Sequence, residues 1–314
     1  MARVTVVVPA YNAARFLPEA LDSVTAQSYH DYELILVDDA STDETAAVAA
    51  SRRAVVIRRG ARGGPAAARN DGIRSGSGEL IALIDADDAW HPEKLRKQVA
   101  LLDARPRAIL AATRAERFGS LARFDPPLEE GEVTEGLLRE NFLVTSSILM
   151  RRSAWERAGP FDTDPGLVSV EDYDLWLRLS LLGEFAALDE VLVRRRLHAG
   201  NLSADHLELY LRTLRVIEKF ELADREGLHA ATIGRRKAEL SYLIGRAHLG
   251  RGQRQSAREA LRRSRALSSG FARRTLPFEC LSFLPASWLS GIGKIRSRLR
   301  AGAAAAGGGP PAAA

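Results

Sequence analysis

The chain has 314 residues, 46% of them hydrophobic, so it can bury the core of one large or two smaller domains. A single cysteine, Cys280, excludes an intrachain disulfide framework, and no apolar segment approaches the roughly 20 residues that a membrane-spanning helix needs. The net charge of +5 hides an asymmetry, because residues 235–314 hold 16 Lys and Arg against 3 Asp and Glu. This basic part shows no zinc-finger spacing or recognition-module motif, so we expect no nucleic-acid partner.

The first hundred residues alternate between short apolar runs and helical patterns, in the manner of βαβ units. We predict strands at 4–8, 32–37, 54–57 and 80–84, and helices at 15–26, 42–51, 65–75 and 92–102. This alternation predicts an α/β fold with a mostly parallel, twisted sheet that is flanked by helices. Ligands of such a sheet bind at the carboxyl ends of its strands.

After a further strand at 108–111, the alternation becomes less regular. Residues 114–141 mix Gly, Pro and acidic residues, which predicts a variable lobe over the sheet. We expect strands at 145–150, 184–187 and 191–197, helices at 154–158 and 171–182, and then an almost entirely helical region. The predicted organisation is an α/β domain at 1–203, a helical extension at 204–270, an amphipathic segment at 271–300 and a disordered tail at 301–314. The amphipathic segment either lies in a membrane interface or covers a domain surface.

Polar residues follow the first two predicted strands. Pro9 fixes the turn and removes a backbone donor, which lets Tyr11 face a ligand ring; a plain strand-ending turn is the alternative. At the tip of the second strand, a carboxylate can accept hydrogen bonds from a base imide or a ribose hydroxyl. We assign this nucleoside contact to Asp39, while Asp38 is either a second contact or structural.

A glycine-rich segment, Gly63-Gly64-Pro65, leads into the predicted helix that carries Arg69. The glycines permit close backbone approach, and the arginine offers a fixed fork for phosphate or carboxylate. The spacing fits neither the dinucleotide-binding fingerprint nor a Walker loop. Arg69 therefore either binds a phosphate or carboxylate of a ligand or braces Asp38 or Asp85 at the helix–sheet junction.

The apolar run at 80–84 ends abruptly in Asp85-Ala86-Asp87-Asp88. Clustered carboxylates resist burial unless something positive joins them, and at a strand's carboxyl end a divalent cation shared with phosphate oxygens fits best. Mg²⁺ or Mn²⁺ suits oxygen-only ligands. We assign the metal to Asp87 and a contact with ribose or a metal-bound water to Asp85, with Asp88 as a further candidate. A solvated acidic turn that caps the next helix is the alternative.

Two further positions carry candidate chemistry. Glu171 and Asp172 open a predicted helix, where the helix dipole favours acidic residues. Asp172 would serve as a general base if it faced the cleft, and Glu171 is a secondary candidate. His198, just after the strand at 191–197, either ligates the metal, contacts phosphate or caps a turn.

Together these motifs resemble the inverting glycosyltransferases of family two, which have the GT-A fold. The matching pieces are VTVVVPAYN, LILVDDASTD, GGPAAARNDGI, GELIALIDADD and VEDYDLWLRL, in this order and at family-like separations. They lie within residues 3–203, two thirds of the chain. One departure is that no Gln-x-x-Arg-Trp sequence occurs, and processive polymer-making relatives carry it. We therefore expect transfer of a single sugar.

The resemblance implies a nucleotide-sugar donor, usually a UDP-sugar, bound together with a divalent metal. On the matching positions, Tyr11 and Asp39 would hold the nucleoside. Asp85 and Asp87 would form the metal-side DxD pair, and Asp172 would be the catalytic base. Arg196 and His198 look like the family's phosphate- or metal-side contact.

The expected function is metal-dependent, inverting transfer of one sugar to a hydroxyl of a glycan or lipid-linked acceptor. We expect the protein in the cytoplasm, either free or peripheral on the inner face of the plasma membrane, where its basic part would meet an anionic surface. Two alternatives stay open. One is a nucleotidyltransferase on a related sheet, although the glycine-rich N-terminal motif expected there is missing; the other is a sugar-nucleotide-binding scaffold without turnover.

Overall fold

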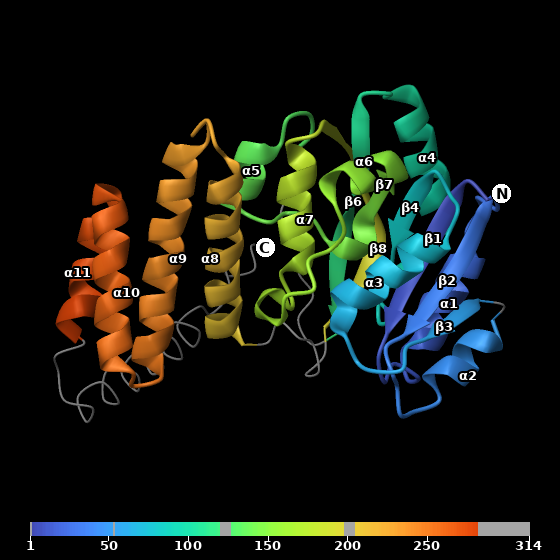
Figure 1. The fold of residues 1–314 in the computed structure, drawn as a ribbon, viewed down its shortest axis with the longest axis horizontal. Coiled ribbons are helices and arrows are strands. Elements are labelled where there is room, and N and C mark those ends of the chain that lie inside the picture. The colour runs from blue at the N-terminus through green and yellow to red at the C-terminus, as the bar shows by residue number, and fades with distance from the viewer. Residues whose placement is uncertain (1, 53, 120–126, 198–204, 282–314) are drawn as a thin grey trace, which may run out of the picture. The chain divides into compact units, whose positions relative to one another are not determined.

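The computed structural model describes residues 2–52, 54–119, 127–197 and 205–281 (Figure 1). The chain divides into two compact units, residues 1–233 and 234–314. The first unit holds the sheet and the helices around it. The second unit is helical in its described part.

The first unit is built on one eight-stranded sheet with the strand order β3-β2-β1-β4-β7-β6-β8-β5. The strands are β1 (Val4–Ala10), β2 (Tyr32–Asp38), β3 (Val55–Arg58), β4 (Leu80–Leu83), β5 (Ala89–Trp90), β6 (Ala108–Gly119), β7 (Ile148–Arg151) and β8 (Glu184–Leu197). Neighbours β3, β2, β1 and β4 run parallel, as do β6 and β8, whereas β7 and β5 pair antiparallel with their neighbours. The predicted mostly parallel sheet is thus confirmed.

Both faces of β1 and β4 and most of β2 are buried, which explains their continuous apolar runs. Side chains alternate between the faces: Val4, Val6 and Val8 join the larger core together with helices α1 (Leu17–Thr25) and α4 (Lys94–Ala104). On the opposite face, Ile35 and Val37 pack against Ala68 of helix α3 (Gly64–Ser75). Helix α3 lies so close to the sheet that a Cβ on Gly72 would come within 2.4 Å of Val7 Cγ1.

The short helix α2 (Thr45–Ala50) connects β2 to β3. Between β6 and β8 lie α5 (Thr134–Arg139), the 3₁₀ turn η1 (Thr145–Ser147), α6 (Arg152–Ala158), the 3₁₀ turn η2 (Pro165–Leu167) and α7 (Glu171–Ser180). Helix α8 (His206–Ala223) completes the first unit and packs against η2 and α7.

Three sequence predictions about strands were wrong. The strand expected from residue 145 begins only at Ile148, because the hydroxyl-bearing residues before it form η1. The two strands expected at 184–187 and 191–197 are one strand, β8, whose pairing with β6 shifts register near Thr113 and Arg114. This pairing carries β6 to Gly119, well past the predicted end at 111.

The second unit contains most of α9 (Ala230–Gly250), then α10 (Arg254–Leu267), the 3₁₀ turn η3 (Ser269–Phe271) and α11 (Ala272–Leu281). Helices α9 and α10 approach closely, since a Cβ on Gly245 would meet Leu261 Cγ at 2.7 Å. The described residues 205–281 are mostly helical, whereas the predicted boundary at 203 between an α/β domain and a helical extension stays a prediction. Most of the expected amphipathic segment and all of the expected disordered tail lie outside the described residues. Among the described helices, none is both long and apolar enough to cross a bilayer.

Candidate active site

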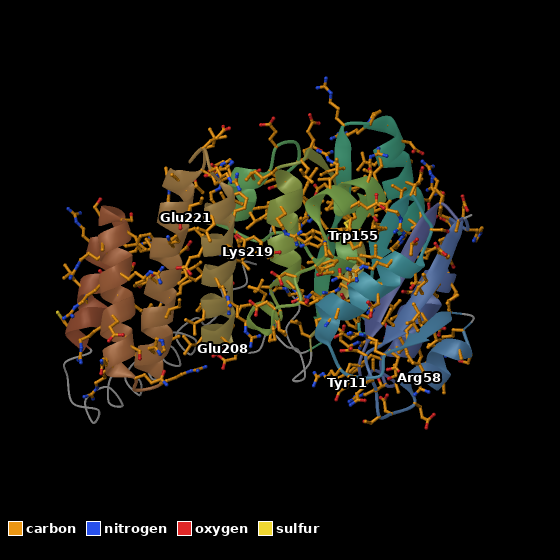
Figure 2. All side chains as sticks on the ribbon, in the orientation of Figure 1. Tyr11, Arg58, Trp155, Glu208, Lys219 and Glu221 are labelled. Carbon is orange, nitrogen blue, oxygen red and sulfur yellow. The ribbon has the colours of Figure 1, made fainter. Side chains whose placement is uncertain are left out.

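The carboxyl ends of β1, β2 and β4 share one edge of the sheet, because these strands are parallel neighbours. The chain runs from β1 to β2 and β3 on one side and returns to β4 on the other side of β1. Strands β1 and β4 thus form the topological switch point, where sheets of this kind bind their ligands. Figure 2 shows Tyr11, which follows β1, at the same end of the sheet as Arg58, the last residue of β3. The sequence motifs at the strand ends therefore converge, as the alternation predicted.

Tyr11 presents an aromatic face at this edge. Its side chain is 39% exposed, and the guanidinium of Arg62 lies 4.0 Å from the ring centroid. Pro9 is half-buried within β1, where it pairs in register with Val37. The accessible ring could stack on a planar ligand in place of the guanidinium.

Asp39 is almost fully buried and shapes the loop before α3. Its Oδ1 accepts hydrogen bonds from Arg59 Nη1 (3.0 Å) and from the backbone N–H of Gly63 (2.8 Å), and its Oδ2 accepts one from the N–H of Gly64 (2.7 Å). Asp38 is buried too, and its Oδ1 accepts a hydrogen bond from the N–H of Ser41. Asp38 thus holds the turn after β2, whereas Asp39 ties this turn to the loop before α3.

Arg69 joins two parts of the site. From the buried face of α3, its Nη2 donates to Asp85 Oδ1 (2.8 Å) and its Nη1 donates to Glu171 Oε1 (2.6 Å). The side chains of Arg69 and Glu171 are each only 5% exposed, whereas that of Asp85 is 36% exposed. The bracing of Asp85, one of the two roles that the sequence left open, is present in the structure. The bridge ties the strand end that carries Asp85 to the start of α7.

The acidic cluster after β4 is held by Ser146 of η1. The backbone N–H of Asp85 donates to Ser146 Oγ (3.0 Å), and this hydroxyl donates to Asp88 Oδ2 (2.6 Å). Burial, reinforced by the charges of Asp85 and Asp87, raises the pKa of Asp88 well above its usual range. The cluster thus carries more negative charge than its surroundings accommodate, and a cation would relieve it.

Arg196 of β8 closes the cluster from the other side. Its backbone N–H donates to Asp88 Oδ1 (3.0 Å), and its Nε donates to the backbone carbonyl of Asp87 (3.2 Å). Its guanidinium also pairs with Glu19 and lies 4.3 Å from the ring centroid of Phe118. Arg196 therefore sits beside the cluster, as predicted, whereas His198 lies outside the described residues.

The oxygen atoms of the acidic cluster suit a hard cation that is also bound by a ligand. Within the described ranges, no three His, Cys, Asp or Glu side chains are arranged to hold a metal ion alone. Asp85 and Asp87 supply only carboxylate oxygens, so they fit Mg²⁺ or Mn²⁺ whose remaining positions are filled by phosphate and water. A divalent cation at these two side chains would therefore have to be shared with a ligand such as a diphosphate.

Asp172 is set up differently from the cluster carboxylates. Its Oδ2 accepts a hydrogen bond from Thr145 Oγ1 (2.7 Å), and its Oδ1 accepts one from the N–H of Tyr173 (2.7 Å). Burial, with help from the charge of Glu171, raises the pKa of Asp172 to about 6, although the Thr145 hydrogen bond and the charge of Arg69 oppose the shift. A carboxylate with this pKa is ionised at neutral pH and still basic enough to accept a proton.

Only one of the two carboxylate oxygens of Glu171 has a hydrogen-bond partner. Its Oε1 binds Arg69, while its buried Oε2 has no hydrogen-bond partner. This oxygen lies beside a cavity of about 10 Å³ lined by the N-terminus of α3 and by residues 162–164. The space is close to the volume that one water molecule occupies.

The sequence analysis missed η1 as a part of the site. Thr145 and Ser146 connect the general-base candidate and the acidic cluster, and both side chains are buried. Trp90 Nε1 donates to the Ser146 carbonyl (2.8 Å), and Gln98 Nε2 donates to the Ser147 carbonyl (2.9 Å), which fixes the turn from behind. Three consecutive hydroxyl residues ahead of an apolar strand were the available indication, since such side chains compete with regular pairing.

Residues 5–159 match the family model described as glycosyl transferase family 2. The chain belongs to this family. One family member from Erwinia amylovora, the amylovoran biosynthesis glycosyltransferase AmsB, is 33% identical in an alignment 196 residues long that covers 57% of this chain and 64% of AmsB. The chain thus spans a little under two thirds of that relative.

Two solved structures share the fold. S. aureus TarS 1-349 in complex with UDP-GlcNAc superposes with a TM-score of 0.66 at 18% identity, covering 90% of this chain and 89% of TarS 1-349. Mannosyltransferase PcManGT from Pyrobaculum calidifontis, in complex with GDP-Man and Mn²⁺, gives a TM-score of 0.61 at 21% identity, covering 89% of this chain and 83% of its own. The GT-A-type fold that the sequence predicted for this family 2 member is confirmed.

Proposed function

We propose that this protein is a metal-dependent, inverting glycosyltransferase that moves one sugar from a nucleotide-sugar, with a UDP-sugar as the first candidate, to an acceptor hydroxyl. The observation that carries the proposal is the link between the two halves of the site. Arg69 joins Asp85 on the donor side to Glu171, and Glu171 directly precedes Asp172, whose pKa is raised to about 6. A proton acceptor is thereby held beside a carboxylate cluster suited to a cation and a diphosphate.

In the proposed reaction, Asp172 takes the proton of the acceptor hydroxyl. The oxygen forms its bond to the anomeric carbon from the face opposite the diphosphate, while the bond from that carbon to the phosphate oxygen breaks and its electron pair leaves with the nucleoside diphosphate. A single displacement inverts the anomeric centre. Thr145 keeps the Asp172 carboxylate oriented through its hydrogen bond to Oδ2.

Asp87, with Asp85 beside it, would hold the divalent cation. Two proteins of this fold support a nucleotide-sugar site with a metal: TarS 1-349 is in complex with UDP-GlcNAc, and PcManGT is in complex with GDP-Man and Mn²⁺. When bound, the metal supplies Lewis-acid stabilisation of the charge that develops on the departing diphosphate. His198 is proposed as a further metal or phosphate contact. Mn²⁺ is the first ion to test, since it accompanies GDP-Man in PcManGT.

For the nucleoside, we propose Tyr11 as the stacking surface. Asp39 would act mainly by holding the loop at Gly63 and Gly64, since its carboxylate already accepts three hydrogen bonds. An incoming base or ribose hydroxyl would then contact the loop that Asp39 holds in place. It could also donate a hydrogen bond to a carboxylate lone pair of Asp39 that the three existing bonds do not use. Pro9 contributes by fixing the backbone ahead of Tyr11.

A glycan or lipid-linked acceptor is proposed because AmsB is named for amylovoran biosynthesis. We also propose that the basic part of the chain meets an anionic membrane surface, since residues 235–314 carry 16 basic and 3 acidic side chains. Sedimentation with vesicles tests the membrane contact. Binding to vesicles with 30% phosphatidylserine, but not to pure phosphatidylcholine vesicles, is expected in low salt, and equal binding to both would contradict it.

The decisive experiment measures nucleotide release and sugar transfer together. The protein is supplied with Mn²⁺, with UDP-glucose, UDP-galactose, UDP-GlcNAc or GDP-mannose, and with octyl glycosides as acceptors. We expect one nucleoside diphosphate per glycosylated product, and an Asp172→Asn variant slowed by about 100-fold or more because its general base is gone. In a parallel reaction with UTP and a sugar 1-phosphate, release of inorganic diphosphate would instead indicate a nucleotidyltransferase. Nucleotide binding without turnover in either reaction would indicate a scaffold.

A further inference from the structure

The segment between α6 and α7, residues 159–170, leads directly into Glu171 and Asp172 and borders the cavity beside Glu171. One residue of this segment, Ser169, has both a strained backbone and an unsatisfied side chain. Ser169 has a positive φ of 74°, which is unfavourable for a residue with a side chain, and its buried hydroxyl has no hydrogen-bond partner. Such a conformation persists only where neighbouring structure holds it, so the restraints on this segment matter for Asp172.

Helix α8 supplies those restraints from one stripe of its surface. Arg212 Nη1 donates to the Val168 carbonyl (2.7 Å), and Arg215 Nη2 pairs with Asp164 Oδ2 (3.0 Å). Lys219 lies one turn further along the helix. The spacing of three and then four residues places all three cations on the same face.

Lys219 contacts two carboxylates at once. Its Nζ lies 2.7 Å from Asp162 Oδ2 and 2.7 Å from Asp174 Oδ1, so it connects the segment to α7 itself. The Asp174 carboxylate is only 4% exposed, which makes this ion pair more than a surface contact. Figure 2 labels Lys219 on the α7 side of α8.

Arg178 of α7 holds the beginning of the segment. It pairs with Asp174 Oδ2 (2.8 Å) and donates to the backbone carbonyls of Gly159 (3.0 Å) and Pro160 (2.9 Å). Asp174 is thus shared between Arg178 and Lys219, so α7, α8 and the segment form one charged network. Val168 and Asp174, which flank Asp172 in the chain, both belong to this network. A shift of α8 would therefore be transmitted to the general-base position.

We propose that α8 is a positioning element of the active site: Arg212, Arg215 and Lys219 hold residues 159–170 so that Asp172 faces the acceptor. This inference rests on the proposed glycosyl transfer. It assigns α8 to the catalytic machinery, although the sequence pattern grouped it with the helical extension. In the part of the chain that the structure describes, these three cations bind residues of the segment and of α7 and do not contact Tyr11, Asp39 or Asp85 on the donor side.

The test compares an Arg215→Gln/Lys219→Gln double variant with an Arg225→Gln control, whose arginine is exposed in the turn after α8. Small displacements of catalytic groups can cost about 100-fold in rate, so we expect kcat/KM for an octyl glycoside acceptor to fall at least about tenfold in the double variant. The KM for the donor and the thermal stabilisation by UDP with Mn²⁺ should stay within about twofold of the unaltered protein, because neither Arg215 nor Lys219 contacts the residues assigned to the donor. A Lys219→Arg variant, which keeps the positive charge, should retain most of the transfer rate of the unaltered protein.

Hydrogen exchange provides a readout that needs no acceptor. Amides of residues 159–170 should exchange faster in the double variant, while those of β1 and β4 stay unchanged. Unchanged exchange in this segment, or a parallel loss of donor binding and transfer, would overturn the positioning role. If the unaltered protein transfers no sugar from any donor, the proposed function fails, and the exchange data still decide whether α8 holds the segment.

Discussion

The hydroxyl of Thr145 donates a 2.7 Å hydrogen bond to Oδ2 of Asp172, across 27 residues of sequence. The next residue along the chain, Ser146, binds Asp85 and Asp88. A single 3₁₀ turn therefore sets the geometry between the carboxylate that would accept the proton and those that would face the metal and diphosphate. This coupling leads to predictions that separate the two halves of the site.

The pH dependence of transfer should reflect Asp172. The base must be ionised, so kcat should fall as the pH drops through about 6. Thr145→Val removes a hydrogen bond that lowers the pKa of Asp172, so the acidic limb should move to higher pH. Glu171→Gln removes a negative charge that raises this pKa, so the limb should move to lower pH. Shifts of the same sign in both variants, measured as kcat against pH, would rule out Asp172 as the titrating group.

Ser146→Ala should loosen the acidic cluster. The change leaves the Asp85 N–H and a buried oxygen of Asp88 without their partner, and each such loss costs about 1–3 kcal/mol. We expect lower stability in urea unfolding and a higher Mn²⁺ concentration for half-maximal activity. Ser147→Ala is the matched control, because the Ser147 hydroxyl donates only to the Val144 carbonyl within the turn. An unchanged Mn²⁺ requirement in Ser146→Ala would contradict the role of this hydroxyl.

Arg69→Met should be strongly destabilising. It leaves the carboxylate of Glu171 buried without its cation, and breaking a buried ion pair in this way costs about 3–5 kcal/mol. The free energy of unfolding in guanidinium chloride measures the effect. Arg105→Met is the control: Arg105 pairs with Glu130 at the surface, and the loss should be below about 1 kcal/mol. Similar losses in both variants would mean that the bridge does not stabilise the site.

Gly72→Ala should destabilise the first unit, because its Cβ would meet Val7 Cγ1 at 2.4 Å and Val37 Cγ2 at 3.1 Å. Helix α3 would have to move off the sheet, at a cost of about 1–3 kcal/mol. Gly234→Ala in α9 meets no heavy atom within 4 Å and should instead stabilise by about 0.5–1 kcal/mol through helix propensity. Thermal unfolding of the two variants should therefore shift in opposite directions.

Much of the donor side could be predicted from the sequence. Short apolar runs that alternate with helical patterns specify parallel strands, and parallel neighbours end at the same edge, so Tyr11, Asp39 and Asp85 had to gather there. A cation site at the three carboxylates after the buried strand stays a prediction of the same kind. These inferences need only local pattern and the geometry of a parallel sheet.

Tertiary structure alone decided which partners these residues have. The contact of Arg69 with Glu171 spans 102 residues, and that of Ser146 with Asp88 spans 58. Periodicity records which face of an element is buried, but it carries no information about which distant side chain meets it there. The restraint of the Asp172 segment by α8 depends on the same fact: the three cations have a helical spacing in the sequence, while the carboxylates and carbonyl that they bind are fixed only when the irregular segment folds against them.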